Sequence, residues 1–443
     1  MSAIAEVLVA MGHRVSGSDL RPSPALDRLR GLGVEVTVGH DGAHVGGIDV
    51  VTNSTAVPAR NPELVAARAR SIPVLARAEM LSAITRLRRT VSVAGTHGKT
   101  TTSAMLAVAM GSAGLDPSYV VGGTIGAGGT GAHWSAGEWL VVEADESDGT
   151  FADLVTDVAL VTSVEPDHLE HYGSFDLLVA AFEGFLAAAP GGRIVCADDP
   201  VALRLGAAAG ASTYGFNTDA SLRIADFAPD RSASRFTVVG DGVELGAVMV
   251  PMPGRHNARN ATGALAVALL VGATFERAAA GIAGFPGVGR RSQLRGERGG
   301  VTFVDDYAHL PGEVTPALAA AADGGWDRIV CVFQPHRYSR TQALWADFAD
   351  AFVDADLVVV TEVYPAGEAP RAGVSGELIA AAVRAAHPAA PIEWQPDRRA
   401  LVAFLRGELR PGDLCLTLGA GDLTTLADEL LVDELQADRA DER

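Results

Sequence analysis

The sequence predicts an α/β protein with parallel sheets. Short apolar runs alternate along the chain with alanine-rich stretches of helical composition, which is the pattern of strands that alternate with helices. The chain has 443 residues, and at roughly 150 residues per domain this length predicts about three domains.

These elements fall into three blocks. The predicted first block, residues 1–88, begins with a helix at residues 4–11 and has strands at residues 16–19, 34–38 and 49–53. The second block, residues 89–286, ends in the Gly-Phe-Pro-Gly cluster at residues 284–287, which is typical of a domain boundary. The third block covers residues 287–443, and its charged tail after residue 435 is expected to fray.

The second and third blocks contain the longer strands. In the second block a helix is expected at residues 100–110 and another near 260–271, and the predicted strands are residues 90–94, 139–143, 159–164, 193–197 and 235–250, the last with an alternation that indicates antiparallel pairing. In the third block the predicted strands are residues 301–305, 328–333, 357–361 and 414–418.

Charge and composition exclude several classes of protein. Asp and Glu number 54 against 35 Lys and Arg, which gives a net charge of −19, so nucleic acid and anionic membranes would repel the chain. No apolar run reaches the roughly 18 residues that span a bilayer, and no secretion signal is visible. The three cysteines are scattered in apolar runs. We therefore expect a cytoplasmic protein with buried thiols.

Lysine occurs once. Of the 35 Lys and Arg residues only Lys99 is lysine, which leaves 34 arginines, so a compositional bias has placed arginine wherever a basic position tolerates it. Lysine carries a compact point charge, whereas the guanidinium of arginine is broad and planar. Position 99 is therefore predicted to require a small ammonium group among phosphates.

This lysine lies in a glycine-rich segment, Gly-Thr-His-Gly-Lys-Thr-Thr, between a predicted strand and a predicted helix. Glycines let backbone N–H groups point inward, the helix N-terminus adds partial positive charge, and lysine reaches the outer phosphates. The residues predicted to bind the phosphates of a nucleotide here are Gly95, Thr96, His97, Gly98, Lys99, Thr100 and Thr101. Thr100 is expected to present its hydroxyl to Mg²⁺.

The loop departs from the strict Walker pattern, whose first glycine would fall at Val93 instead of Gly95. The alternative interpretation of the segment is a glycine-rich turn in which the lysine falls by chance.

The loop and several later segments resemble the Mur ligase family, in order and over almost the whole chain. These segments are Val142–Asp148 (VEADESD), Glu165–Tyr172 (EPDHLEHY), Pro253–Asn260 (PGRHNARN), Asp305–His309 (DDYAH), Phe333–Thr341 (FQPHRYSRT) and Val363–Pro370 (VYPAGEAP). The last two are most similar to the alanine-adding members. The resemblance implies a Rossmann-like N-terminal domain that binds the UDP substrate, a central P-loop ATPase domain and a Rossmann-like C-terminal domain.

The resemblance also implies an activity. It is the ATP-dependent joining of L-alanine to the carboxylate of UDP-N-acetylmuramate through an acyl phosphate, in peptidoglycan synthesis, with Mg²⁺. Two alternatives remain: a recycling ligase that attaches a whole tripeptide to the same nucleotide sugar, and a non-catalytic ATP-binding remnant.

The resemblance assigns catalysis to Lys99, Glu143 and His168, with Thr100, Glu143 and His168 at the metal. Glu143 ends an apolar strand, at the edge of an α/β sheet where ligands bind. His168 considered alone fits a hydrogen-bonded structural histidine equally well. The acids that follow Glu143, which are Asp145, Glu146 and Asp148, are expected to be solvated charges or supports.

Further residues are assigned to substrates by the same resemblance. Asn257 and Asn260 are expected to contact ATP, although asparagine at a helix start is more commonly a cap. Arg291 and Asp306 are expected at the triphosphate and ribose. The residues expected on the amino-acid side are His309, His336 and Arg340, and Arg340 without the resemblance indicates only a surface charge.

The chain departs from the family pattern at three places. It starts where the family's opening glycine-rich motif ends, so we expect Met1 to be an internal methionine of a longer natural protein. Leu310 stands where the family has a second histidine, and Ser163 replaces an asparagine. The last two changes put substrate positioning in question.

The substitution Lys99→Arg is predicted to abolish ATP-dependent ligation although it keeps the positive charge, because the guanidinium does not fit a site shaped for an ammonium. The measurement is ADP release under saturating substrates. Near-normal turnover would contradict the role assigned to Lys99.

Overall fold

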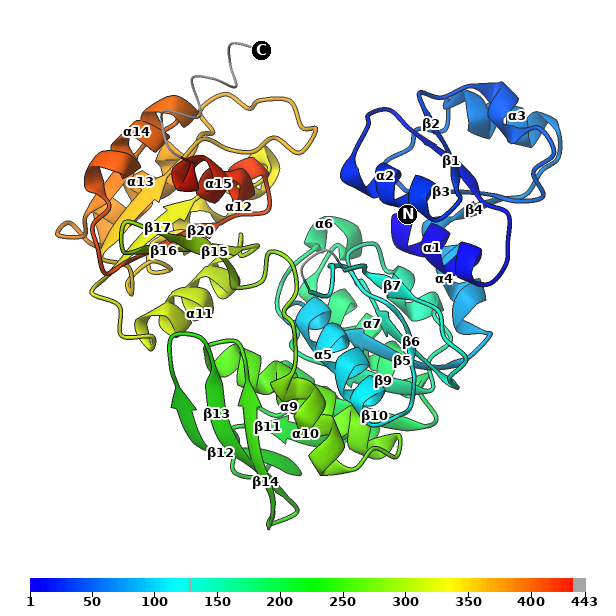
Figure 1. The fold of residues 1–443 in the computed structure, drawn as a ribbon, viewed down its shortest axis with the longest axis horizontal. Helices are drawn as coiled ribbons and strands as arrows, with labels where there is room; N and C mark the ends of the chain where they lie inside the picture. The colour runs from blue at the N-terminus through cyan, green and yellow to red at the C-terminus, as the bar shows by residue number, and fades with distance from the viewer. Residues whose placement is uncertain (127–128, 433–443) are drawn as a thin grey trace. The chain divides into compact units, whose positions relative to one another are not determined.

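A computed structural model describes residues 1–126 and 129–432 (Figure 1); the tail that we expected to fray lies outside these residues. The chain divides into two compact units. One comprises residues 1–225, 237–248 and 259–286, and the other comprises residues 226–236, 249–258 and 287–443. No helix in the described ranges is both long and apolar enough to cross a membrane.

The N-terminal part has short strands in two parallel pairs, β1 with β2 and β3 with β4, where a Rossmann-like sheet was expected. Its elements are α1 (Ser2–Ala10), β1 (Ser16–Asp19), α2 (Pro24–Gly31), β2 (Glu35–Val38), η1 (Gly42–Val45), β3 (Val51–Asn53), α3 (Pro62–Ala69), β4 (Val74–Ala76) and α4 (Arg77–Thr85). Proline at the first position and a capping Ser23 or Asn61 begin helices α2 and α3.

A ten-stranded sheet follows, in the order β14-β13-β12-β11-β10-β9-β5-β8-β6-β7. Its strands are β5 (Arg89–Ala94), β6 (Ser118–Val120), β7 (Ala132–His133), β8 (Trp139–Glu143), β9 (Val158–Val161), β10 (Gly192–Cys196), β11 (Ser212–Gly215), β12 (Leu222–Pro229), β13 (Ser234–Gly240) and β14 (Val243–Val250). Strand β5 pairs in parallel with β8 on one side and β9 on the other. All three strands are rich in valine and buried, which suits the middle of a parallel sheet.

Helices flank this sheet, and two of them position the glycine-rich loop. They are α5 (Lys99–Ser112), η2 (Thr150–Asp153), α6 (Leu169–Tyr172), α7 (Phe175–Ala187), α8 (Pro200–Ala209), α9 (Arg255–Leu270) and α10 (Phe275–Ala283). Helix α5 starts directly after the loop and is buried along most of its length. Gly281 of α10 lets the two helices approach, because a Cβ there would lie 2.8 Å from the Cα of Ala109.

Two expectations for this sheet need correction. The strand predicted at residues 159–164 ends at Val161. The Thr162 N–H still donates to the carbonyl oxygen of Ala94, but the Thr162 hydroxyl and Ser163 bond to the glycine-rich loop. The stretch predicted as one strand at residues 235–250 is two strands, β13 and β14. They are joined at Asp241 and Gly242, which both have positive φ, and a connection of two residues allows only antiparallel pairing.

The C-terminal sheet has the order β15-β16-β20-β17-β18-β19 and is parallel except for β15. Its elements are β15 (Gln293–Arg298), β16 (Val301–Asp306), α11 (Pro311–Ala322), β17 (Arg328–Phe333), α12 (Tyr338–Leu344), η3 (Trp345–Phe348), β18 (Leu357–Val360), α13 (Glu377–Ala386), β19 (Ile392–Trp394), α14 (Arg398–Glu408), β20 (Asp413–Leu418), η4 (Asp422–Thr425) and α15 (Leu426–Leu431). Successive residues of β17 pack into two different cores, Cys331 in one and Val332 in the other, so both faces of the sheet are covered.

Gly281→Ala is predicted to destabilise the protein by about 1–3 kcal/mol, because the new methyl group overpacks the contact between α10 and α5. Gly111→Ala on α5 is the matched control: no atom lies within 4 Å of its added Cβ, so alanine should stabilise the helix by about 0.5–1 kcal/mol. Denaturant unfolding followed by circular dichroism measures both. If both substitutions changed the free energy of unfolding in the same direction, the contact between α10 and α5 would not be tightly packed.

Candidate active site

The glycine-rich loop joins the end of β5 to α5 and needs glycine at two positions. Gly95 has φ 133° and Gly98 has φ 80°. A Cβ on Gly95 would collide with the side chain of Thr162 and lie 2.9 Å from the nitrogen of Ser163, and a Cβ on Gly98 would lie 2.5 Å from Oδ1 of Asn260. Both glycines therefore permit an approach of neighbouring segments that no other residue allows.

Two residues that follow β9, Thr162 and Ser163, hold the loop through hydrogen bonds. The Thr96 N–H donates to the carbonyl oxygen of Ser163 (2.9 Å), and the His97 N–H donates to the Ser163 hydroxyl (3.0 Å). The Thr162 hydroxyl donates to the carbonyl oxygen of His97 (2.5 Å). The serine that replaces the family's asparagine therefore supports the loop, a role that the sequence interpretation missed.

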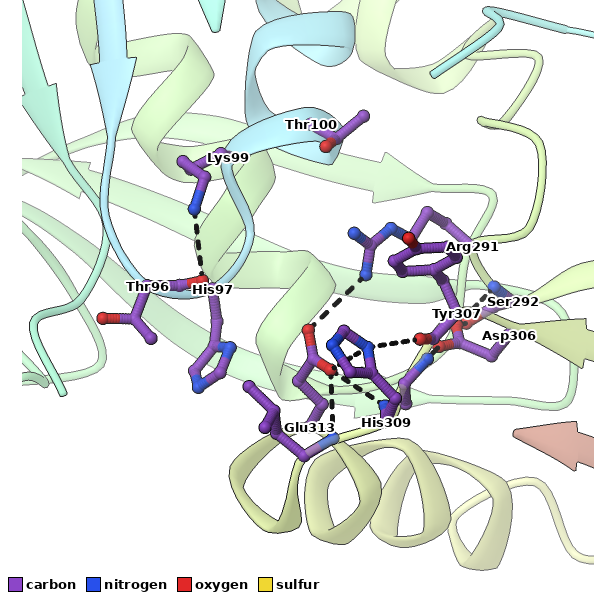
Figure 2. Close-up of polar contacts among 12 residues, drawn as sticks. Thr96, His97, Lys99, Thr100, Arg291, Ser292, Asp306, Tyr307, His309 and Glu313 are labelled. Atoms are coloured by element: carbon purple, nitrogen blue, oxygen red, sulfur yellow. Dashed lines mark hydrogen bonds and ion pairs between the residues drawn. The ribbon is translucent and has the colours of Figure 1, made fainter. Parts of the chain in front are cut away.

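Lys99 folds back over the loop. Its Nζ donates to the carbonyl oxygen of Thr96 (3.3 Å) (Figure 2). It also donates to the carbonyl oxygen of Gly95 (2.6 Å) and to Oε1 of Glu146 (2.8 Å). Burial by itself would lower the pKa of Lys99, but Glu146, Asp145 and Glu143 raise it. The ammonium group therefore stays protonated. Glu146 is 1% exposed and accepts a hydrogen bond from Lys99, so of the two roles expected for it, that of a solvated charge is wrong and that of a support is confirmed.

Thr100 and Glu143 together present two oxygen atoms. The Thr100 hydroxyl donates to Oε1 of Glu143 (2.8 Å), while Oε2 of Glu143 accepts from the N–H of Gly122 (2.5 Å). Neighbouring ligands on an octahedral Mg²⁺ at 2.0–2.1 Å lie roughly 2.9 Å apart. The spacing and the hard oxygen donors of this pair therefore fit Mg²⁺.

His168, the third predicted metal residue, lies at the start of the short helix α6 with φ 54°. Its Nε2 is 3.4 Å from Oδ2 of Asp167. The described residues contain no group of three or more His, Cys, Asp or Glu side chains that could hold a metal. The predicted ligands Thr100, Glu143 and His168 include only two residues of these types, so the absence of such a group does not test them. Their role at a metal stays a prediction.

The two asparagines of α9 differ in their contacts. Asn260 accepts a hydrogen bond from the Thr102 hydroxyl (3.3 Å) and lies against Gly98, so it belongs to the surroundings of the loop. Asn257 is 1% exposed and donates to the carbonyl oxygen of Pro253 (2.8 Å). It lies inside the first turn of α9, so the alternative role as a cap is wrong.

In the C-terminal unit Asp306 ends β16 and His309 follows it, while His336 and Arg340 follow β17, which is separated from β16 by β20. Arg291 precedes β15, which runs antiparallel to β16. Both carboxylate oxygens of Asp306 accept backbone N–H groups, from Ser292 (2.7 Å) and Ala308 (2.8 Å). Burial raises the pKa of Asp306, and Arg291 opposes this shift. The carboxylate thus fixes the backbone of the edge, and contact with ribose would use a remaining lone pair.

Glu313 links two other predicted residues. Its Oε1 is 3.9 Å from NH1 of Arg291, and its Oε2 accepts the N–H of His309 (2.9 Å) (Figure 2). Leu310 is buried and occupies the N-cap position of α11, where its N–H donates to Oε2 of Glu313 (3.3 Å), so the residue that replaces the family's second histidine belongs to the core. Glu313 was not predicted; its spacing from the helix start is the signal for a capping box.

His336 and Arg340 form the other part of this edge. The ring of His336 stacks on Tyr364 at 5.7 Å and meets the ring of His309 edge-on at 5.6 Å. NH1 of Arg340 lies 3.3 Å from Nδ1 of His336. Because a guanidinium only donates, Nδ1 accepts, and the neutral ring carries its proton on Nε2.

The parallel sheets and the strand–loop–helix phosphate site define a nucleotide-binding α/β protein. Three family models match successive parts of the chain: the Mur ligase family catalytic domain at residues 1–89, the Mur ligase middle domain at 93–268, and the Mur ligase glutamate ligase domain at 290–421. The chain belongs to the Mur ligase family and has its three-domain architecture.

Individual relatives of the chain are consistent with this family assignment. A UDP-N-acetylmuramate–L-alanine ligase of Bradyrhizobium diazoefficiens is 46% identical over 438 residues, which cover 96% of this chain and 94% of the relative. One of the same name from Solidesulfovibrio magneticus is 46% identical over 428 residues, 96% of this chain and 93% of the relative. The crystal structure of a UDP-N-acetylmuramate–alanine ligase from Thermotoga maritima matches with a TM-score of 0.83 at 26% identity and covers 100% and 97% of the two chains.

The His336 ring is predicted to stay neutral until the pH falls to about 4. Burial, with His309, Arg340 and Arg337, lowers the pKa of His336 to about 4. The unfolded chain binds this proton near pH 6.5, so the His336 contribution to stability is present above pH 6.5 and is lost as the pH falls toward 4. NMR titration of histidine rings, with His336→Asn to assign the signal, measures the pKa. A midpoint near 6.5 would contradict the burial of this ring.

Proposed function

We propose that the chain joins L-alanine to the carboxylate of UDP-N-acetylmuramate, with ATP converted to ADP and phosphate. The observation that carries the proposal is the single lysine, Lys99, held by the loop and Glu146 at the start of α5. The loop is what an ATP-dependent member of this family needs, and the curated relatives at 46% identity are L-alanine ligases.

The chemistry requires activation of the carboxylate. A carboxylate is resonance-stabilised and a poor electrophile, so its oxygen first attacks the γ-phosphorus of ATP and ADP leaves. The amine of L-alanine then attacks the carbonyl carbon of the acyl phosphate, and inorganic phosphate leaves. The chain has to hold the phosphates, spread the charge that develops on them, and orient the amine.

Lys99 and the first backbone N–H groups of α5 are the groups that hold the phosphates. These N–H groups lack intrahelical partners by helix geometry and carry the positive end of the helix dipole. Asn260, which contacts the loop at Gly98, keeps the start of α5 in place. When bound, Mg²⁺ would lie on Thr100 and Glu143, with His168 as the further predicted ligand, and would neutralise phosphate charge.

The amino acid is proposed to bind at the edge that carries His309, His336 and Arg340. A guanidinium suits the carboxylate of an amino acid. The Nε2–H of His336 offers a fixed donor, because stacking on Tyr364 and the contact with Arg340 fix the ring. Asp306 and Arg291 are proposed to contact ATP from the same unit.

Two alternatives can be compared with this proposal. A murein peptide ligase from Psychrobacter arcticus matches with a TM-score of 0.69 at 23% identity, 97% and 95% of the two chains, a likeness that shows the fold alone. A non-catalytic remnant would have no need to keep its only lysine in the loop. We also propose that the reaction occurs in the cytoplasm and serves peptidoglycan synthesis.

ADP release is predicted to require both UDP-N-acetylmuramate and L-alanine. The measurement is a coupled assay with each substrate omitted in turn, and with L-alanyl-γ-D-glutamyl-meso-diaminopimelate in place of L-alanine. The proposal predicts that L-alanine supports turnover and that the tripeptide does not. Turnover with the tripeptide alone would identify a recycling ligase, and no turnover with either would favour the remnant.

A further inference from the structure

The carboxylate of Glu146 is buried beside the phosphate loop, with only one of its two oxygens in use. Its side chain is 2% exposed, and Oε1 accepts a hydrogen bond from Nζ of Lys99 at 2.8 Å. Oε2 is buried and has no hydrogen-bond partner among the described residues. A buried carboxylate oxygen without a partner is costly, so this pair is not an ion pair optimised for stability alone.

The backbone holds Glu146 in this place. Its carbonyl oxygen accepts from the N–H of Gly149 (3.0 Å) and from the hydroxyl of Tyr172 (2.6 Å). Gly149 has φ 74°, a conformation that glycine adopts without strain. The carboxylate is thus aimed at Lys99 by a constrained turn.

All three hydrogens of the Lys99 ammonium already have acceptors in the chain: the carbonyl oxygens of Gly95 and Thr96 and the carboxylate of Glu146. A phosphate oxygen that binds Lys99 must replace one of them. The two carbonyls belong to the loop itself, which Thr162 and Ser163 hold. Glu146 is the charged acceptor, and its negative charge also opposes an incoming phosphate.

We infer that Glu146 is a positioning residue that serves as the counter-ion of Lys99 while the loop is empty and releases Lys99 when phosphate arrives. The inference rests on the proposed function, because it takes Lys99 as the group that meets the nucleotide. Its consequence is that nucleotide competes with an internal carboxylate, so the observed affinity is lower than that of a loop with Lys99 already released.

The test is titration calorimetry of a non-hydrolysable ATP analogue with Mg²⁺. Glu146→Gln keeps the size of the side chain and an acceptor oxygen but removes the charge. The variant is expected to bind the analogue roughly three- to ten-fold more tightly than the wild type. Damage to the structure would weaken binding instead, so the direction of the change separates the two causes.

Asp145→Asn is the matched control. Asp145 also acts electrostatically on Lys99, but its own hydrogen bond is to the N–H of Ser147. The control removes one negative charge near the loop without freeing Nζ, and it should change the affinity less than Glu146→Gln does. If both variants changed the affinity for the analogue equally, Glu146 would act only through its negative charge and not through its hydrogen bond to Lys99, and the inference would be overturned.

A second set of proteins tests the pairing itself. In a Lys99→Met background Glu146→Gln should tighten binding of the analogue less than it does in the wild-type background, because only the direct repulsion between Glu146 and phosphate is relieved and the group that Glu146 releases is gone. Equal tightening without Lys99, or unchanged or weaker binding in the single variant, would overturn the inference while the proposed function stands. A wild type that does not bind the analogue would overturn both.

Discussion

A desolvated ammonium group and its acceptors set the conditions for the whole phosphate site. A buried charge is tolerated only where it is paired and hydrogen-bonded, and Lys99 meets this requirement with two loop carbonyls and Glu146. The carbonyls come from the loop after β5 and the carboxylate from the turn after β8, and these strands are neighbours in the sheet. The parallel order of the sheet therefore delivers both partners to one edge, as expected for ligand sites in open α/β sheets.

Strand β9, on the other side of β5, helps to hold the phosphate loop because it ends before the residues that bond to the loop. Strand β9 stops at Val161, and the next two residues bond to the loop through the Thr162 hydroxyl and through the hydroxyl and carbonyl of Ser163. Since Gly95 has no Cβ, the segment after β9 lies close enough to the loop to do so, and Gly98 permits the same close approach of Asn260. These contacts within the chain fix the conformation of the loop, and a loop fixed in this way loses less entropy when it binds phosphate.

The C-terminal unit uses buried carboxylates in a similar way. The carboxylates of Asp306 and Glu313 accept hydrogen bonds from backbone N–H groups of the segments around Ser292 and His309. This bonding holds the backbone of the region in which Arg291, His336 and Arg340 are proposed to contact substrates. The lowered pKa of His336 and its stacking on Tyr364 favour a neutral ring with one defined tautomer.

The sequence by itself determined the fold class and the place of the phosphate loop. Those features depend on local patterns, which can be identified without knowledge of contacts. The patterns are the apolar runs of β5 and β8, the glycines at positions 95 and 98, and the single lysine, Lys99. The apolar run Arg328–Phe333 is a strand where it was predicted. Other elements differ: the stretch 235–250 is two strands, and the helix predicted near residues 260–271 begins at Arg255.

Only the tertiary structure decided which polar residues work together. Glu146 stands in an acidic run whose members cannot be ranked by sequence, and burial against Lys99 separates it from its neighbours. Ser163 was noticed as a departure from the family pattern, yet its hydrogen bond to the loop depends on where β9 ends. Hydrogen bonds between segments more than 40 residues apart depend on chain packing, and a pattern along one segment does not contain that information.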